Sequence, residues 1–118
     1  MQVCVIDDDP LMLKHVEEML TGLGCQVVSA PDVNTALKQM TVHYCDAAVV
    51  DILMPDRDGL NFILEIRRTR PDLRIVAISG GGRLGAGTLL GMAKALGADA
   101  TLVKPFSSSE LEFALAAT

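Results

Sequence analysis

The sequence has no tryptophan, one tyrosine and three phenylalanines, so aromatic residues make up only 3% of its 118 residues. Basic residues are also a minority, with 10 Lys and Arg against 15 Asp and Glu and a formal net charge of −5. This acidic balance argues against binding of nucleic acid or an anionic membrane through bulk charge. No apolar run is long enough to span a bilayer, and Met1–Gln2 lacks the basic start of a signal peptide. These absences predict a cytoplasmic protein that binds neither nucleic acid nor membrane.

Cysteine is scarce as well. Cys4, Cys25 and Cys45 are odd in number, far apart and contain no C-x-x-C pair, so a disulfide framework or a zinc site is not indicated. We expect them to be small buried hydrophobic residues in a reducing compartment. Half of the residues are hydrophobic, which excludes disorder. A chain of this length buries roughly two thirds of its unfolded surface and therefore folds without such cross-links.

Apolar patterning and helix-start signals alternate along the chain. Five short apolar runs predict β-strands, and apolar residues at helical spacing follow each of them. The predicted strands are Gln2–Ile6, Gln26–Ser29, Asp46–Asp51, Arg74–Ser79 and Ala100–Val103. The predicted helices begin at Asp9-Pro10, Asp32, Asp58-Gly59 and the capping box Ser107-x-x-Glu110, and a further helix covers Leu89–Leu96.

Five strand-then-helix repeats predict an α/β fold with a five-stranded parallel sheet and helices on both faces. Right-handed crossovers and short loops favour the flavodoxin-like strand order 2-1-3-4-5. The run DAAVVD at 46–51 has a continuously apolar middle, which is typical of a central strand covered on both faces. Length and repeat count together predict one domain over residues 1–118.

Polar side chains follow four of the predicted strands at the point where each strand ends. Asp7 and Asp8 follow the first strand, Asp51 ends the third, Ser79 ends the fourth and Lys104 follows the fifth. In sheets of this kind, ligands bind at the carboxyl ends of the strands where the strand order reverses, here between the first and third strands. We therefore expect these five side chains to meet at one edge of the sheet.

Such a group of carboxylates needs a counter-charge. Two like charges about 4 Å apart repel by roughly 4 kcal/mol at an effective dielectric constant of about 20. An all-oxygen set with few protein ligands suits Mg²⁺, which keeps several waters and often bridges to a phosphate. Lys104 can meet an anionic ligand, and Ser79 supplies a hydroxyl donor. Together these residue types predict a phosphoryl-transfer site with an aspartate as the acceptor.

In these residues the chain resembles the receiver domain of two-component response regulators, of the chemotaxis-regulator type. The motifs that carry the resemblance are Asp7-Asp8, D-x-x-M-P-x-x-D-G from Asp51 to Gly59, Ser79, and Lys104-Pro105-Phe106. They occur in the family's order and span essentially the whole chain. The resemblance implies a signalling switch without an output domain, rather than an enzyme.

The resemblance also implies a role for each acidic residue. Asp51 is expected to be the phosphoacceptor, which takes a phosphoryl group from a histidine of a sensor kinase or a phosphotransfer protein. Asp8 and Asp51 are expected to ligate Mg²⁺ directly, with the backbone carbonyl of Leu53 as a third protein ligand. Asp7 is expected to act through a metal-bound water.

The remaining motif residues are expected to hold the phosphoryl group. By resemblance, Ser79 and Lys104 contact its oxygens, and the peptide bond between Lys104 and Pro105 is cis, a form that costs only about 0.5–1 kcal/mol before proline. Water attack later resets Asp51. The signal is expected to pass to a downstream protein target.

One position departs from the family pattern. Receivers usually carry Tyr or Phe on the fifth strand, three residues before the lysine, and this chain has Thr101 there. The usual switch through that aromatic side chain is therefore not available. The sequence instead favours the glycine-rich stretch after Ser79 as the segment that reports phosphorylation, because glycine weakens the start of a helix.

Two other interpretations remain open from the sequence. The departure at Thr101 is compatible with a pseudo-receiver, a binding module of the same fold that is not phosphorylated. In addition, Gly80, Gly82 and Gly85 satisfy G-x-G-x-x-G, and Asp99 follows, as in a dinucleotide-binding enzyme. That motif belongs after the first strand of a nucleotide-binding unit, and only one further strand follows it here.

Overall fold

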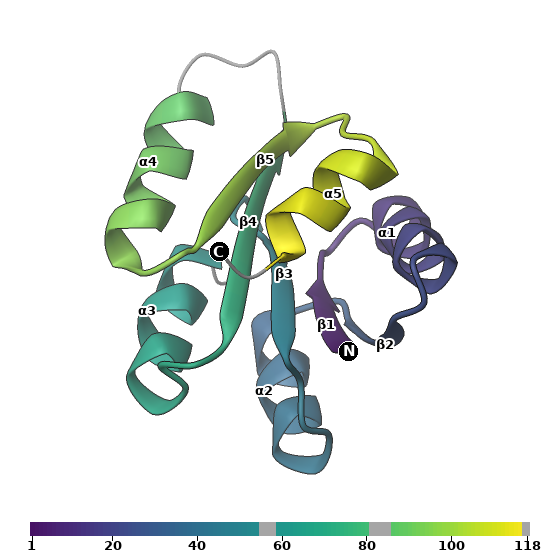
Figure 1. Cartoon of the computed structure of the whole chain (residues 1–118). Coiled ribbons are helices and arrows are strands. Elements are labelled where there is room, and N and C mark those ends of the chain that lie inside the picture. The colour runs from purple at the N-terminus through teal and green to yellow at the C-terminus, as the bar shows by residue number, and fades with distance from the viewer. Residues whose placement is uncertain (55–58, 81–85, 117–118) are drawn as a thin grey trace.

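The computed structural model describes residues 1–54, 59–80 and 86–116 and is shown in Figure 1. Strands and helices alternate along the whole described chain. The strands are β1 (Gln2–Ile6), β2 (Gln26–Ala30), β3 (Ala47–Asp51), β4 (Arg74–Gly80) and β5 (Ala100–Lys104). The helices are α1 (Pro10–Gly22), α2 (Val33–Val42), α3 (Gly59–Thr69), α4 (Ala86–Leu96) and α5 (Ser108–Leu115).

The five strands form one parallel sheet in the order β2-β1-β3-β4-β5, which confirms the predicted topology. β3 lies in the centre, between β1 and β4, and all five of its residues are buried. The strand order reverses between β1 and β3, where Ile6 is in register with Val50. The carboxyl ends of these two strands therefore lie side by side.

Helices cover both faces of the sheet, and the alternating side chains of each strand divide the core into two layers (Figure 1). On one face, Val3 and Val5 of β1 pack with buried residues of α1 and α5. On the other face, Cys4 and Ile6 pack with buried residues of α2, α3 and α4. The alternation follows from the two-residue period of a strand, which points successive side chains to opposite faces.

Most predicted boundaries agree with the structure. Asp9 and Asp32 cap α1 and α2, since their carboxylates accept hydrogen bonds from the backbone N–H groups of Leu11 and Thr35. The predicted capping box at the start of α5 is present in full. Asp46 lies just outside β3, although its N–H donates to Gln2 O at 2.8 Å. Asp58, predicted to open α3, lies outside the described residues.

The predicted start of the fourth helix is wrong by three residues, because α4 begins at Ala86 rather than at Leu89. The glycine content of the segment suggested a shorter helix. The helix nevertheless includes Gly87 and Gly91, and its Leu90 and Ala93 are buried in the core layer shared with α3. Gly82 and Gly85 of the glycine-rich stretch lie outside the described residues.

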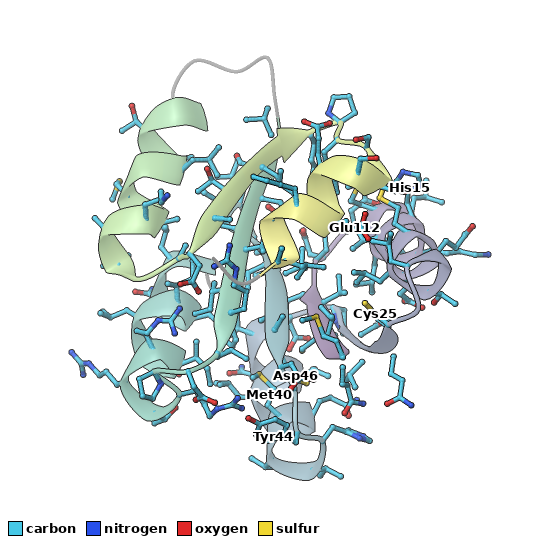
Figure 2. All side chains as sticks on the ribbon, in the orientation of Figure 1. His15, Cys25, Met40, Tyr44, Asp46 and Glu112 are labelled. Carbon is cyan, nitrogen blue, oxygen red and sulfur yellow. The ribbon has the colours of Figure 1, made fainter. Side chains whose placement is uncertain are left out.

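The three cysteines are free, as expected, and Cys4 and Cys45 are buried. Cys25 is only half-buried, near the start of β2 (Figure 2). Among the described residues, no helix is long and apolar enough to cross a membrane.

Candidate functional site

Three carboxylates meet at the carboxyl edge of the sheet, where β1 and β3 end. Asp7 and Asp8 follow β1, and Asp51 is the last residue of β3. One oxygen from each carboxylate lies within 4.8 Å of the others. Asp7 and Asp51 are buried and Asp8 is exposed, so the cluster is open to solvent on one side. The predicted convergence of these residues is therefore present in the structure.

Backbone N–H groups hold the two buried carboxylates in place. Asp7 Oδ1 accepts a hydrogen bond from Asp9 N at 3.0 Å, and Asp51 Oδ1 accepts one from Leu53 N at 2.9 Å. Each carboxylate thus bends the chain back on itself two residues later, as aspartate often does where a strand ends in a turn. One oxygen of each side chain is fixed in this way, and the second oxygen faces the cluster.

Lys104 contacts both buried carboxylates from the end of β5. Its Nζ lies 3.2 Å from Asp7 Oδ2 and 3.3 Å from Asp51 Oδ2. The following peptide bond, between Lys104 and Pro105, is cis. Charge-assisted contacts of this kind are stronger than neutral hydrogen bonds, and here a single ammonium group is shared by two anions.

This arrangement leaves an excess of negative charge. Burial, opposed by the Leu53 N–H and reinforced by the charge of Asp7, raises the pKa of Asp51 to about 6. Burial lowers the pKa of Lys104, but the charges of Asp51 and Asp7 outweigh it, so the pKa rises and Lys104 stays protonated. A further cation in the cluster would favour the ionised form of Asp51 and lower this pKa.

Ser79 is the fourth component of this edge. It lies on β4, one residue beyond Ile78, which is in register with Asp51. Its side chain is fully buried, and its Oγ has no hydrogen-bond partner among the described residues. A buried hydroxyl without a partner costs free energy. Such a group fits a site that is completed by a ligand.

The donor set fits a divalent cation of the magnesium type. It consists of carboxylate oxygens, two of them buried and one exposed, so that a cation can keep some of its water. The carbonyl of Leu53 belongs to the same turn as Asp51, and the Leu53 side chain is exposed. Within residues 1–54, 59–80 and 86–116, no histidine or cysteine joins the cluster, which disfavours a zinc site made from these residues.

Thr101 lies away from this cluster. It is half-buried on β5 and lines a hollow of about 610 Å³ between β5 and α5, together with Phe113, whose side chain is 78% exposed. Pro105 lines a separate hollow of about 300 Å³ against His15 of α1. Figure 2 shows His15 on the side of α1 that faces α5. Neither hollow contains one of the clustered carboxylates.

The sequence did not indicate the role of Asp9 in this site. Its position before Pro10 predicted a helix cap, and Asp9 does cap α1. Its N–H also donates to Asp7 Oδ1 and so orients that carboxylate. The two-residue spacing of Asp7 and Asp9 could have suggested this contact, because an aspartate side chain often accepts a hydrogen bond from the N–H two residues later.

The fold agrees with what comparison with known proteins shows. Residues 3–116 match the model of the response regulator receiver domain. The chain belongs to this family. Gly80 ends β4 in this receiver domain, and the other two glycines of the G-x-G-x-x-G stretch lie outside the described residues.

Curated relatives of the receiver domain are longer regulators. This chain is 36% identical over 111 residues to the probable transcriptional regulator ycf27 of Guillardia theta, and the match covers 94% of this chain and 42% of that protein. It is 32% identical over 112 residues to the two-component response regulator PhoP of Pseudomonas aeruginosa, and that match covers 95% of this chain and 48% of PhoP. The receiver domain thus spans less than half the length of these two relatives.

Solved structures include chains of similar size. The chemotaxis protein CheY4 of Vibrio cholerae superposes on the receiver domain with a TM-score of 0.84 at 26% sequence identity, covering 97% of this chain and 94% of that one. The likeness therefore extends over nearly the whole of both chains.

Proposed function

We propose that this receiver domain is phosphorylated on Asp51 in a Mg²⁺-dependent reaction by a histidine of a sensor kinase or a phosphotransfer protein. The observation that carries the proposal is the position of Asp51, a buried carboxylate between two other carboxylates, a lysine and a partnerless hydroxyl. The chain itself is a switch, and its chemistry is limited to acceptance and loss of the phosphoryl group.

In the proposed reaction, a carboxylate oxygen of Asp51 attacks the phosphorus of a phosphohistidine. The new P–O bond forms as the P–N bond breaks, and the imidazole leaves with the bonding electron pair and takes up a proton. Hydrolysis reverses the modification when water attacks the phosphorus and Asp51 leaves as a carboxylate.

Each neighbouring group has a proposed task. Asp8, Asp51 and the carbonyl of Leu53 hold Mg²⁺ directly, and Asp7 holds it through a water. Bound Mg²⁺ supplies positive charge that offsets the carboxylates and the phosphoryl oxygens. Lys104 already lies 3.3 Å from Asp51 Oδ2 and contacts a phosphoryl oxygen from that side.

Ser79 supplies the neutral donor of the proposed site. Its unused Oγ–H donates to a phosphoryl oxygen, which satisfies the buried hydroxyl only in the phosphorylated state. Interactions present only after transfer favour the product and stabilise charge that develops during the reaction.

The proposed signal passes from this cytoplasmic receiver domain to a downstream protein by direct contact. The net charge of −5 makes nucleic acid a poor partner for these residues themselves, although ycf27 and related curated proteins are named transcriptional regulators. Residues 1–118 act as one receiver domain in this proposal. Because residue 101 is Thr, the proposed signal does not pass through an aromatic side chain at that position.

The test is phosphorylation by acetyl phosphate with Mg²⁺, followed by intact mass measurement. We expect one phosphoryl group per chain, none after Asp51→Asn, and none when Mg²⁺ is chelated. Asp72→Asn is the matched control, because Asp72 is an exposed aspartate at the opposite edge of the sheet. Failure of the wild-type chain to accept a phosphoryl group from any donor favours the pseudo-receiver instead. Residual labelling of the Asp51→Asn chain indicates a second acceptor, with Asp8 the first to examine.

A further inference from the structure

Gly59, the first residue of α3, packs directly against the backbone that carries Asp51. A Cβ atom built on Gly59 would lie 2.5 Å from Asp51 O and 2.9 Å from Ile52 Cα. A third contact, to Val50 Cγ1, would be 2.8 Å. These distances are shorter than van der Waals contact, and two of the three involve backbone atoms, which cannot rotate away. Only glycine fits this position without displacing β3 or α3.

Space, rather than backbone conformation, explains the glycine. Positive φ angles occur at Gly24 and Gly97 among the described residues, and Gly59 is not one of these. Glycine is also a poor helix former, so a position inside a helix without a packing requirement favours alanine. A Cβ atom built on Gly91 in α4 would have nothing within 4 Å, so a glycine within a helix of this protein is not closely approached merely because it is glycine.

The contacted backbone belongs to the site. Asp51 supplies the acceptor carboxylate, and its Oδ1 accepts a hydrogen bond from Leu53 N at 2.9 Å. Ile52 lies between these two residues, and its N–H donates to Ile78 O at 3.1 Å, which ties the turn to β4. Gly59 meets this turn from the face of the sheet on which α3 packs. The turn is therefore held both by β4 and by the first turn of α3.

We propose that Gly59 is a positioning residue for Asp51 and Leu53. Its missing side chain lets α3 close on the 50–52 backbone and thereby sets the direction of the acceptor carboxylate and of the Leu53 carbonyl. Gly59 contacts neither metal nor phosphoryl group; it acts through the backbone of residues that do. The inference rests on the proposed function of Asp51 and deepens it.

The test compares Gly59→Ala with Gly91→Ala, the same substitution in a helix where the added methyl meets nothing. We expect Gly59→Ala to shift the amide resonances of Ile52 and Leu53 in the metal-free protein and to weaken Mg²⁺ binding by about 10–100-fold in calorimetry, the range seen when groups that orient metal ligands are changed. The phosphorylation rate should fall by a similar factor, since small misplacements slow positioned reactions. Gly91→Ala should leave the Ile52 and Leu53 resonances in place and keep the Mg²⁺ affinity and the phosphorylation rate within about twofold of the wild type.

A second control separates positioning from simple loss of stability. Ile63→Val removes one buried methylene from the same helix, on a residue that is fully buried and lies outside the site. We expect Ile63→Val to lower stability and to leave Mg²⁺ affinity unchanged. Equal Mg²⁺ affinity of folded Gly59→Ala and the wild type overturns the inference. So does a loss of affinity in Ile63→Val as large as that in Gly59→Ala.

A double variant keeps the test decisive if Gly59→Ala does not fold. Val50→Ala removes the side-chain contact and leaves the two backbone contacts in place. Val50→Ala with Gly59→Ala should therefore still bind Mg²⁺ more weakly than Val50→Ala alone, and equal affinity overturns the inference. The proposed function can fail separately. If the wild-type chain binds Mg²⁺ but accepts no phosphoryl group, and Gly59→Ala weakens Mg²⁺ binding, only the positioning role of Gly59 is retained. A wild-type chain that binds no Mg²⁺ overturns both.

Discussion

At the edge of the sheet where the strands begin, charged side chains are paired with backbone carbonyls and with one another. At the carboxyl edge, two buried carboxylates share one lysine beside an exposed third carboxylate. Arg67 illustrates the first edge. Its guanidinium donates to Gly97 O, Leu73 O and Asp99 Oδ2 at 2.7 to 2.8 Å. It thereby connects the end of α3 with the segments that lead into β4 and β5.

Further pairs surround Arg67 at this amino edge. Arg70 lies 4.6 Å from the centre of the Tyr44 ring and 3.1 Å from Asp72 Oδ1. The hydrogen bond from Arg70 lowers the pKa of Asp72, so the carboxylate there is favoured. Figure 2 shows Tyr44 and Asp46 together at this end of the molecule, away from the β5–α5 turn.

The carboxyl edge shows the opposite pattern. Burial raises the pKa of Asp51 to about 6, and Ser79 Oγ has no partner among the described residues. The difference teaches that polar groups at one edge are satisfied within the protein and stabilise the fold, while those at the other are left incomplete for a ligand. Substitutions at the two edges should therefore change stability in opposite directions.

The largest expected effect is at the amino edge. Arg67→Ala removes hydrogen bonds to several carbonyls and the ion pair with Asp99, and should lower the free energy of unfolding by about 2–4 kcal/mol in a urea titration. Arg68→Ala is the matched control, since Arg68 is the next residue of α3 and is exposed. A loss of stability no larger than that of Arg68→Ala would contradict the comparison.

A smaller effect of opposite sign is expected at Asp51. Its pKa is higher in the folded than in the unfolded protein, so the stability linked to its proton is present below about pH 3.8 and lost as the pH rises through about 6. Without Mg²⁺, Asp51→Asn should therefore be more stable than the wild type by about 1–2 kcal/mol near neutral pH, allowing for the lost contact with Lys104. The difference should shrink as the pH falls from about 6 to about 4.

Thermal unfolding over this pH range, with a chelator present, measures that effect. Added Mg²⁺ is the internal control, because it should stabilise the wild-type chain and leave Asp51→Asn unchanged. An Asp51→Asn chain that is less stable than the wild type at every pH would show that Asp51 is satisfied within the metal-free protein.

The smallest effect is expected at Ser79. Ser79→Ala removes a buried hydroxyl that has no partner among the described residues. It should change the free energy of unfolding by less than about 1 kcal/mol, in the direction of higher stability. The same substitution at Ser107, whose hydroxyl accepts a hydrogen bond from Glu110 N at 3.1 Å, should instead cost about 1 kcal/mol. Denaturant unfolding of the two variants gives the comparison directly, and an equal loss in both would remove the distinction between a paired and an unpaired hydroxyl.

Much of the fold could be predicted because its signals are local. The continuous apolar run of β3, the capping residues Asp9 and Asp32, and the alternation of strand and helix each depend on neighbouring residues only. Asp7, Asp8 and Asp51 could be grouped because the carboxyl ends of parallel strands necessarily lie at one edge.

The remaining features depend on how separate elements pack. α4 begins at Ala86 and includes Gly87 and Gly91, although glycine is a poor helix former. Besides carbonyls of the nearby turn, Arg67 reaches Gly97 O, which lies 30 residues away in the chain. The contact of Gly59 with the Asp51 backbone and the absence of a partner for Ser79 Oγ are likewise set by distances between elements. Neither residue type nor spacing in the sequence specifies such distances.

The central position of β3 also bears on how often the backbone next to Asp51 opens to solvent. It is paired with β1 and β4 on its two sides, and each of its residues is buried. Backbone amides of such a central strand exchange with solvent mainly through unfolding of the whole domain. Asp51 therefore ends the segment that opens least often. In the proposed function, hydrolysis at the carboxylate rather than opening of β3 sets the lifetime of the phosphoryl group. Hydrogen exchange along β3 then reports the stability of the whole domain with and without phosphorylation.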